Sequence, residues 1–191
     1  MLQDLMVSKV RAKLLSTFLS QPKEMFYIRQ LVRLIGEEIN AIRQELKRME
    51  KKGMVKKESR GNRIYYWFNK EHPLYQDILS MVCKIVGLGG EIVKKKSKLG
   101  NVRYALLSGR LAKGLPPRAE GVDLLVIGEI NLPGLSSIIR EQEAKLGREI
   151  NYSVMTKEEF DFRRKRRDPF LMGILSDSKI MLIGEEEGLF I

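Results

Sequence analysis

Apolar residues recur at intervals of three or four in three successive segments near the start of the chain, which is the spacing of one face of an α-helix. This pattern predicts helices over residues 7–20, 27–35 and 37–52. The first segment is followed by Gln21-Pro22, and the other two are followed by Gly36 and Gly53. Proline disfavours helix at the residue before it, and glycine commonly follows a helix, so each predicted helix has a physical stop.

The pattern then changes to that of extended chain. Residues 54–59 predict one strand, and the aromatic and β-branched residues 64–68 predict a second. They are joined by Arg60-Gly61-Asn62-Arg63, in which glycine and asparagine tolerate positive φ, so the two strands form a hairpin. A further helix is predicted over residues 74–86. Its apolar face fits packing on its own domain and fits a dimer interface equally well.

The second half of the chain alternates strands and helices, an arrangement typical of α/β proteins. Thr156 and Glu159 form a capping box at the start of one of the helices. Residues 111–121 contain Gly114-Leu115-Pro116-Pro117 and predict a loop. The other predicted elements are helices over residues 91–98 and 135–146 and strands over residues 104–107, 122–127, 148–155 and 178–183.

The segment Gly87-Leu88-Gly89-Gly90 is the best candidate for a domain boundary. We therefore expect a two-domain protein of mixed α+β and α/β class, with domains at residues 1–86 and 87–191. Charge separates the same two parts, because residues 1–100 carry 21 Lys and Arg against 10 Asp and Glu, whereas residues 101–191 carry 14 of each. The whole net charge of +11 thus lies in the first half. This asymmetry indicates a polyanionic partner for that half, with a merely solvated basic surface as the alternative.

Three helices followed by a strand, a basic turn and an aromatic strand are the order of a winged helix-turn-helix. In that fold the third helix enters the major groove and the hairpin, or wing, contacts the phosphate backbone. Opposite its apolar side, the third predicted helix carries side chains able to read base edges, namely Asn40, Arg43, Gln44 and Lys47. Cations suited to phosphate contacts come from the predicted wing and the second helix: Lys56, Lys57, Arg60, Arg63, Arg29 and Arg33.

Four stretches together resemble the arsenical-repressor type of winged-helix transcription regulator, and the resemblance spans residues 8–86. They are residues 26–31, 42–49, 53–55 and 60–66. The resemblance implies a homodimer that binds a partly palindromic operator in double-stranded DNA. Metal-sensing members carry cysteine pairs on the recognition helix, and this chain has no cysteine there, so the resemblance does not extend to metal sensing. The alternative is a winged helix that contacts another protein.

Trp67 and Phe68 fit two interpretations. As aromatic residues beside basic ones, they fit a platform on which bases stack. As residues of the second wing strand, they fit core packing against the first helix, which is the interpretation we favour.

In the second half, residues 108–114 followed by 121–128 resemble the small nucleotidyltransferase domains of the kanamycin-nucleotidyltransferase superfamily. Residues 146–152, 157–160 and 168–170 extend the resemblance over residues 90–188. It implies a mixed-sheet α/β domain. In active members a Gly-Ser turn binds the triphosphate, and three carboxylates hold divalent metal, since hard Mg²⁺ requires several carboxylate oxygens.

The chain departs from this pattern at each catalytic position. Gly109 is followed by Arg110 where the serine belongs, and Gly121 replaces the first Asp, which leaves Asp123 alone. The third position is matched by Asn151, a neutral amide, with Glu149 expected one pleat away on the same face of a strand. One carboxylate cannot form a two-metal clamp, so we expect a non-catalytic domain without a bound metal.

Such a domain has two remaining uses, which are dimerisation and the binding of a ligand without turnover. A nucleotide or another anion would contact the phosphate-loop region, where Gly109, Arg110, Lys113, Arg118 and Asp123 are the candidate residues; a solvated loop is the alternative. The basic run of residues 163–167 is suited to DNA, to an acidic partner or to solvent, and the acidic residues 185–187 are placed to neutralise it.

Other features of the sequence argue against a membrane protein, a secreted protein and a protein with a Cys/His metal site. No apolar run approaches the ~20 residues of a membrane helix, and the first residues lack the pattern of a signal peptide. Cys83 is the single cysteine and His72 the single histidine, so an internal disulfide and a Cys/His metal site within one chain are excluded. We expect a cytoplasmic protein.

Three hypotheses follow from the sequence. The first is a DNA-binding transcription regulator whose second domain dimerises or senses a ligand. The second is a Mg²⁺-dependent nucleotidyltransferase that uses Asp123 and holds a nucleic acid with its winged helix. The third is a protein-interaction module in which neither half contacts nucleic acid.

Overall fold

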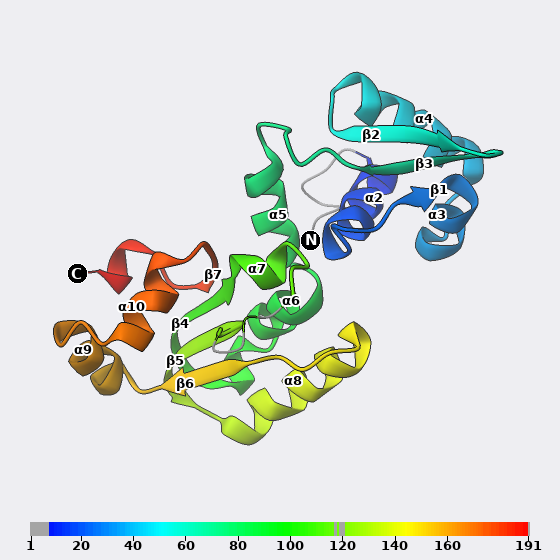
Figure 1. Cartoon of the computed structure of the whole chain (residues 1–191). Helices are drawn as coiled ribbons and strands as arrows, with labels where there is room; N and C mark the ends of the chain where they lie inside the picture. Colours follow the sequence, from blue (N-terminus) through cyan, green and yellow to red (C-terminus); the bar gives the residue numbers. More distant parts are fainter. Residues whose placement is uncertain (1–7, 117, 119–120, 191) are drawn as a thin grey trace. The chain divides into compact units, whose positions relative to one another are not determined.

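A computed structural model describes residues 8–116, 118 and 121–190 of the chain (Figure 1). The protein is a mixed α/β fold with two small sheets, and its described residues include nine α-helices. It divides into two compact units, unit 1 from Met1 to Val82 and unit 2 from Cys83 to Ile191. Within the described residues, no helix is long and apolar enough to cross a membrane.

Unit 1 builds a helical cluster on one side of a three-stranded antiparallel sheet of order β1-β3-β2. Buried side chains of the helices, such as Leu15, Phe18, Leu31 and Leu46, form its core with Phe26 and Phe68 from the sheet. Its elements are α2 (Lys9–Ser20), β1 (Phe26–Tyr27), α3 (Ile28–Ile35), α4 (Ile39–Lys51), β2 (Val55–Arg60) and β3 (Arg63–Phe68), followed by α5 (Tyr75–Cys83), which ends in unit 2.

Local chemistry fixes the ends of these elements. The Ser8 hydroxyl accepts a hydrogen bond from the Arg11 amide and starts α2, and Gly36, at φ 63°, closes α3. The hairpin turn predicted at residues 60–63 is confirmed, with Arg60 paired to Arg63 and Gly61 at φ 58°. The two-residue strand β1 was not predicted. It is too short to show a period, and it is held by its pairing with β3 and by the burial of Phe26 against Phe18.

Unit 2 contains a mixed sheet of order β6-β5-β4-β7, in which only the β5–β6 pair is parallel. One face is covered by α9, α10 and η2, whose Phe160, Leu171 and Leu189 join Leu106 and Leu125 in a buried cluster. The elements are α6 (Gly87–Lys94), η1 (Lys96–Lys98), β4 (Gly100–Ser108), α7 (Gly109–Ala112), β5 (Leu124–Ile130), α8 (Leu132–Leu146), β6 (Tyr152–Met155), α9 (Lys157–Lys165), α10 (Pro169–Ser176), β7 (Lys179–Ile183) and η2 (Glu187–Leu189).

The glycine-rich segment that suggested a boundary is helical. Residues 87–90 form the first turn of α6, and the division between the units lies before them. A Cβ at Gly89 would lie 2.2 Å from the Cys83 carbonyl oxygen and 3.0 Å from a methyl group of Leu107. Glycine is therefore required here for close packing of α6 on the sheet, and not for a flexible linker.

Several predicted boundaries in unit 2 shift for physical reasons. The strand expected over residues 148–155 begins only at Tyr152, because the Ile150 and Asn151 amides donate to the side chains of Glu143 and Asp123. The loop expected from residue 111 begins with the last residues of α7, and α10 was not predicted at all. The capping box is confirmed in part, since the Thr156 hydroxyl accepts a hydrogen bond of 3.1 Å from the Glu159 amide.

Candidate functional site

The exposed face of α4 carries the four side chains expected to read base edges. α4 starts after Glu38, whose carboxylate accepts a hydrogen bond of 2.6 Å from the Asn40 amide. One face of the helix is buried through Ile42 and Leu46. The opposite face is exposed and consists of Asn40, Arg43, Gln44 and Lys47. Arg43 donates to the Asn40 side-chain oxygen at 3.3 Å, so these two side chains form one polar group.

A buried carboxylate, which the sequence analysis missed, lies on the other side of α4. Glu45 is only 2% exposed. It accepts hydrogen bonds from Arg11 at 2.5 Å and from the Ser8 hydroxyl at 3.2 Å, both at the start of α2, and Arg48 lies at 3.4 Å. Charged groups are rarely buried unless paired. The signal available in the sequence was a glutamate within the apolar stripe of a helix. Its effect is to tie α4 to the start of α2.

The β2–β3 hairpin carries four exposed cations, three of which have a carboxylate partner within unit 1. Lys56 lies 2.5 Å from Glu71, Lys57 lies 3.0 Å from Glu50, and Arg60 lies 2.9 Å from Glu58. The Glu50 hydrogen bond raises the pKa of Lys57, and the Lys56 hydrogen bond lowers the pKa of Glu71. These pairs are solvent-exposed and weak, so a phosphate can replace the carboxylate.

Arg63 instead lies over the ring of Tyr27, 4.7 Å from its centroid. The Tyr27 hydroxyl accepts a hydrogen bond of 2.9 Å from Arg33 of α3. Tyr27 thus contacts two arginines that are predicted to bind phosphate. Both arginines, Tyr27 and Arg29 line an open hollow of about 780 Å³. The structure therefore brings Arg29, Arg33 and Arg63 together at one place, at the tip of the hairpin.

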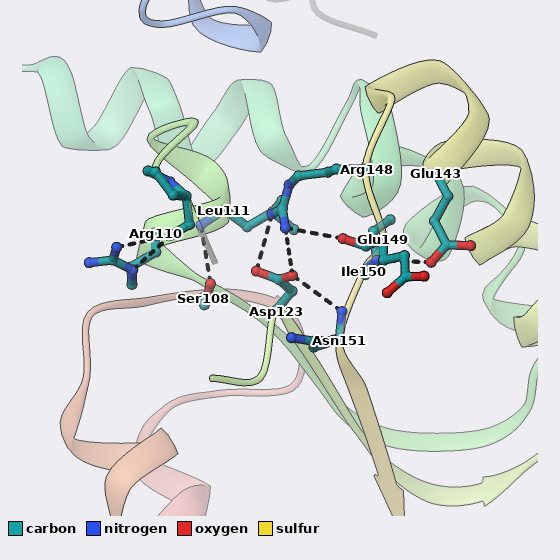
Figure 2. A network of polar contacts seen from close by, with 10 residues as sticks. Ser108, Arg110, Leu111, Asp123, Glu143, Arg148, Glu149, Ile150 and Asn151 are labelled. Atoms are coloured by element: carbon teal, nitrogen blue, oxygen red, sulfur yellow. Dashed lines mark hydrogen bonds and ion pairs between the residues drawn. The ribbon is translucent and has the colours of Figure 1, made fainter. Parts of the chain in front are cut away.

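In unit 2, the residues expected to form a phosphate loop are used for internal contacts (Figure 2). The Gly109 amide donates to the Ser178 carbonyl at 2.6 Å, and the Leu111 amide donates to the Ser108 hydroxyl at 3.1 Å. Arg110 donates to the Pro116 carbonyl at 2.9 Å. Lys113 is half-buried at the end of α7. A Cβ at Gly109 would lie 2.2 Å from the Ser178 hydroxyl, so this glycine serves close packing.

Asp123 is buried and its charge is neutralised inside the unit (Figure 2). Arg148 binds both carboxylate oxygens, at 3.1 and 3.2 Å, and the Asn151 amide donates to one of them at 3.2 Å. The carboxylate thus accepts three hydrogen bonds from one short segment. Asp123 holds the start of β5 to that segment, and both of its oxygens are occupied.

The expected arrangement of Glu149 and Asn151 on one strand face is wrong. Both residues precede β6, so strand alternation does not apply to them. The Glu149 carbonyl accepts a hydrogen bond from Arg148 at 3.1 Å, and its side chain is exposed. Among the described residues, no group of three or more His, Cys, Asp or Glu is placed to hold a metal ion.

A hollow of about 650 Å³ lies beside Asp123, between the ends of β4 and β5 and the helix α10. Two of its cations are paired: Arg118 lies 2.8 Å from Asp177, and Lys179 lies 2.9 Å from Glu186. The expected neutralisation of residues 163–167 by the acidic residues 185–187 therefore fails for Glu186. Within the basic run, Arg163 pairs with Glu159 of its own helix at 2.8 Å.

No protein-family model, curated protein or solved structure matches the chain.

Proposed function

We propose that the chain is a DNA-binding transcription regulator in which unit 1 acts as a winged helix-turn-helix. The observation that carries the proposal is the polar face of α4, because Asn40, Arg43, Gln44 and Lys47 are all exposed while the opposite face is buried. Asparagine and glutamine suit adenine and arginine suits guanine, so this face fits a major groove. The hairpin beside it carries cations suited to flanking phosphates.

The arrangement of unit 1 supports the same proposal. The helix pair α3 and α4 is followed directly by the β2–β3 hairpin, which is the order of a winged helix. Arg29, Arg33 and Arg63 gather at the hairpin tip with no carboxylate partner among the described contacts of the unit. A cluster of unneutralised guanidinium groups is a natural phosphate site. We propose that the regulator binds a partly palindromic operator as a homodimer.

We propose that unit 2 is a non-catalytic, nucleotidyltransferase-like domain. Its role would be to dimerise or to bind an anionic ligand. The bidentate Asp123–Arg148 pair supports this, because a carboxylate whose two oxygens are both bonded to a guanidinium is not available to a metal ion. Transfer of a nucleotide in the presence of Mg²⁺, lost in Asp123→Asn, would instead establish the enzyme hypothesis.

The proposal is tested by selecting sites from random duplex DNA with the purified protein at about 150 mM salt. We expect enrichment of a discrete, partly palindromic sequence. Arg43→Ala and Gln44→Ala are expected to lose discrimination at individual positions by ~1–3 kcal/mol each. Arg140→Ala, an exposed arginine of unit 2, is the matched control and should leave the selected site unchanged.

Replacing a residue proposed to contact phosphate should give a different result from replacing an α4 residue. Arg63→Ala should weaken binding to all duplexes similarly and lower the dependence of log K on log salt by about 1. If both α4 variants keep the wild-type sequence preference, the recognition role of α4 is wrong. If no duplex binds even at low salt, the protein-interaction hypothesis takes its place.

A further inference from the structure

The outer face of the sheet in unit 1 carries an aromatic row that the duplex-binding proposal does not use. Side chains alternate along a strand, so β3 sends Tyr66 and Phe68 to one face and Tyr65 and Trp67 to the other. Tyr66 and Phe68 are buried in the core, at 8% and 4% exposure. Phe68 therefore packs as expected, whereas Trp67 does not lie in that core. It is half-exposed on the outer face.

The strand pairing places a third ring on this face. Tyr27 of β1 is directly opposite Tyr65, and the two ring centroids are 5.8 Å apart at an interplanar angle of 71°. Tyr65 and Trp67 are two residues apart on one strand, which separates their Cα atoms by about 7 Å. Tyr27, Tyr65 and Trp67 thus form a continuous row across two strands, defined here as the aromatic row.

Basic side chains lie at both ends of the aromatic row. At the hairpin tip, Arg63 lies over the Tyr27 ring at 4.7 Å and Arg60 lies 5.9 Å from the centre of the Tyr65 ring. At the other end, Trp67 lines a second hollow, of about 400 Å³, together with Lys23, Lys56 and Lys70. Glu24, Glu58 and Glu71 are the acidic residues on or beside this face, and they are outnumbered by the cations.

Partly exposed rings interleaved with cations have a specific chemical complement. An aromatic face attracts another planar ring, and a guanidinium or ammonium attracts a phosphate. Bases of a duplex are stacked on one another and cannot lie on these rings, whereas unpaired bases can. Stacking of bases on aromatic side chains inside a positively charged groove is how single strands are bound without a sequence code.

We infer that the aromatic row binds a single-stranded nucleic acid, with unpaired bases stacked on Trp67 and Tyr65 and phosphates held by Arg63 and the flanking lysines. This surface shares no stacking residue with α4. The chain would therefore bind a duplex through α4 and an unpaired strand through the outer face of the sheet. The two proposals share phosphate-binding cations such as Arg63 and Lys56, but the stacking ring of Tyr65 and the α4 side chains can be altered separately, so the inference does not require the duplex-binding proposal to hold.

The single tryptophan of the chain makes a direct test possible, because all tryptophan fluorescence comes from Trp67. The full-length protein is titrated with an oligothymidylate of about 15 nucleotides at low salt. We expect saturable quenching as bases stack on the indole ring. An oligouridylate of the same length distinguishes a preference for RNA from one for DNA, and inorganic polyphosphate supplies charge without bases.

Variants separate stacking from charge. Tyr65→Leu should weaken binding of the oligothymidylate about 5- to 150-fold, the range expected for one stacked base, whereas Tyr65→Phe should retain it. Tyr152→Leu removes an exposed tyrosine of unit 2 and is the matched control. Arg43→Ala should leave oligothymidylate binding unchanged while it alters duplex selection.

Some outcomes would overturn the inference. These are an absence of quenching at low salt, equal quenching by polyphosphate, or unchanged affinity in a folded Tyr65→Leu variant. If Tyr65→Leu fails to fold, the comparison of oligothymidylate with polyphosphate on the wild-type protein decides alone. If the wild-type protein selects no duplex site while its fluorescence is still quenched by oligothymidylate, the α4 proposal is wrong and this one stands.

Discussion

Arg148 binds both carboxylate oxygens of Asp123 through the two terminal nitrogens of its guanidinium group. The carboxylate is 5% exposed and the arginine side chain 25% exposed, so the pair is largely shielded from water. A bidentate pair of this kind is both strong and geometrically specific. In this chain it connects the start of β5 to the segment that leads into β6.

We predict that Arg148→Ala destabilises unit 2 by about 3 kcal/mol, because it leaves the Asp123 charge buried without its counter-ion. Calorimetric unfolding, with hydrogen exchange of β5 amides to locate the effect, measures it. Arg148→Ala combined with Asp123→Asn should recover part of the loss, since the uncompensated charge is then absent. Arg140→Ala, an exposed arginine on α8, serves as control, and an equal loss in that variant would contradict the prediction.

We predict that Glu45 contributes more to the stability of unit 1 than any other polar side chain described in it. Glu45→Gln should lower the free energy of unfolding by about 2 kcal/mol, because a buried hydrogen-bonded charge is replaced by an imperfectly matched amide. Urea unfolding followed by Trp67 fluorescence reports on this unit alone. Glu50→Gln, which breaks the more exposed pair with Lys57, should change stability by less than about 1 kcal/mol. Losses from Glu45→Gln and Arg11→Ala that simply add would argue against direct coupling.

Burial raises the pKa of the Cys83 thiol from 9.0 to about 11. A thiol whose pKa is higher in the folded state favours folding below the unfolded pKa, and this contribution is lost as pH rises through the folded value. We therefore expect wild-type stability to fall more steeply between pH 9 and about 11 than that of Cys83→Ala. Parallel pH profiles for the two proteins would show that Cys83 does not titrate in this way. At neutral pH the folded thiol should react slowly with disulfide reagents.

Two helical glycines are predicted to respond oppositely to alanine. Gly89→Ala should destabilise unit 2 by about 2 kcal/mol, because the new Cβ would lie 2.2 Å from a backbone carbonyl oxygen. Gly173→Ala, on α10, has nothing within 4 Å of the new methyl group and should stabilise by roughly 0.5–1 kcal/mol. Thermal unfolding of the two variants tests both signs, and a stabilised Gly89→Ala variant would show that α6 is not tightly packed.

The local pattern of apolar and polar residues was sufficient to predict most of the secondary structure of unit 1. The apolar periodicity and the glycine stops predicted α2, α3 and α4 to within a few residues, and Gly61-Asn62 predicted the hairpin turn. These features depend on residues close together in the chain, so sequence carries them. The exposure of the α4 polar side chains follows in the same way, since an amphipathic helix buries its apolar side.

The features that the local pattern did not predict depend on long-range packing. The glycines at residues 87–90 have the composition of a linker, yet contacts with Leu107 and with the chain around Cys83 and Ile85 make them part of a packed helix. Whether a strand residue faces the core depends on register and on the neighbouring strand, which is why Trp67 and Phe68 were expected on one face and lie on two. The Ile150 and Asn151 amides, just before β6, likewise bond to the side chains of Glu143 and Asp123, the latter distant in the sequence.

Neighbouring residues were enough to predict α2, α3, α4 and the β2–β3 hairpin, together with the uneven distribution of charge and the residue types available to contact a polyanion, because each is a property of composition or of nearby positions. Tertiary structure alone decided that Arg148 neutralises Asp123, that Glu45 is buried between two helices and that Tyr27 joins Tyr65 and Trp67 in one row. These relationships join residues far apart in the chain. Their geometry is fixed by strand register and helix packing, which no local pattern encodes.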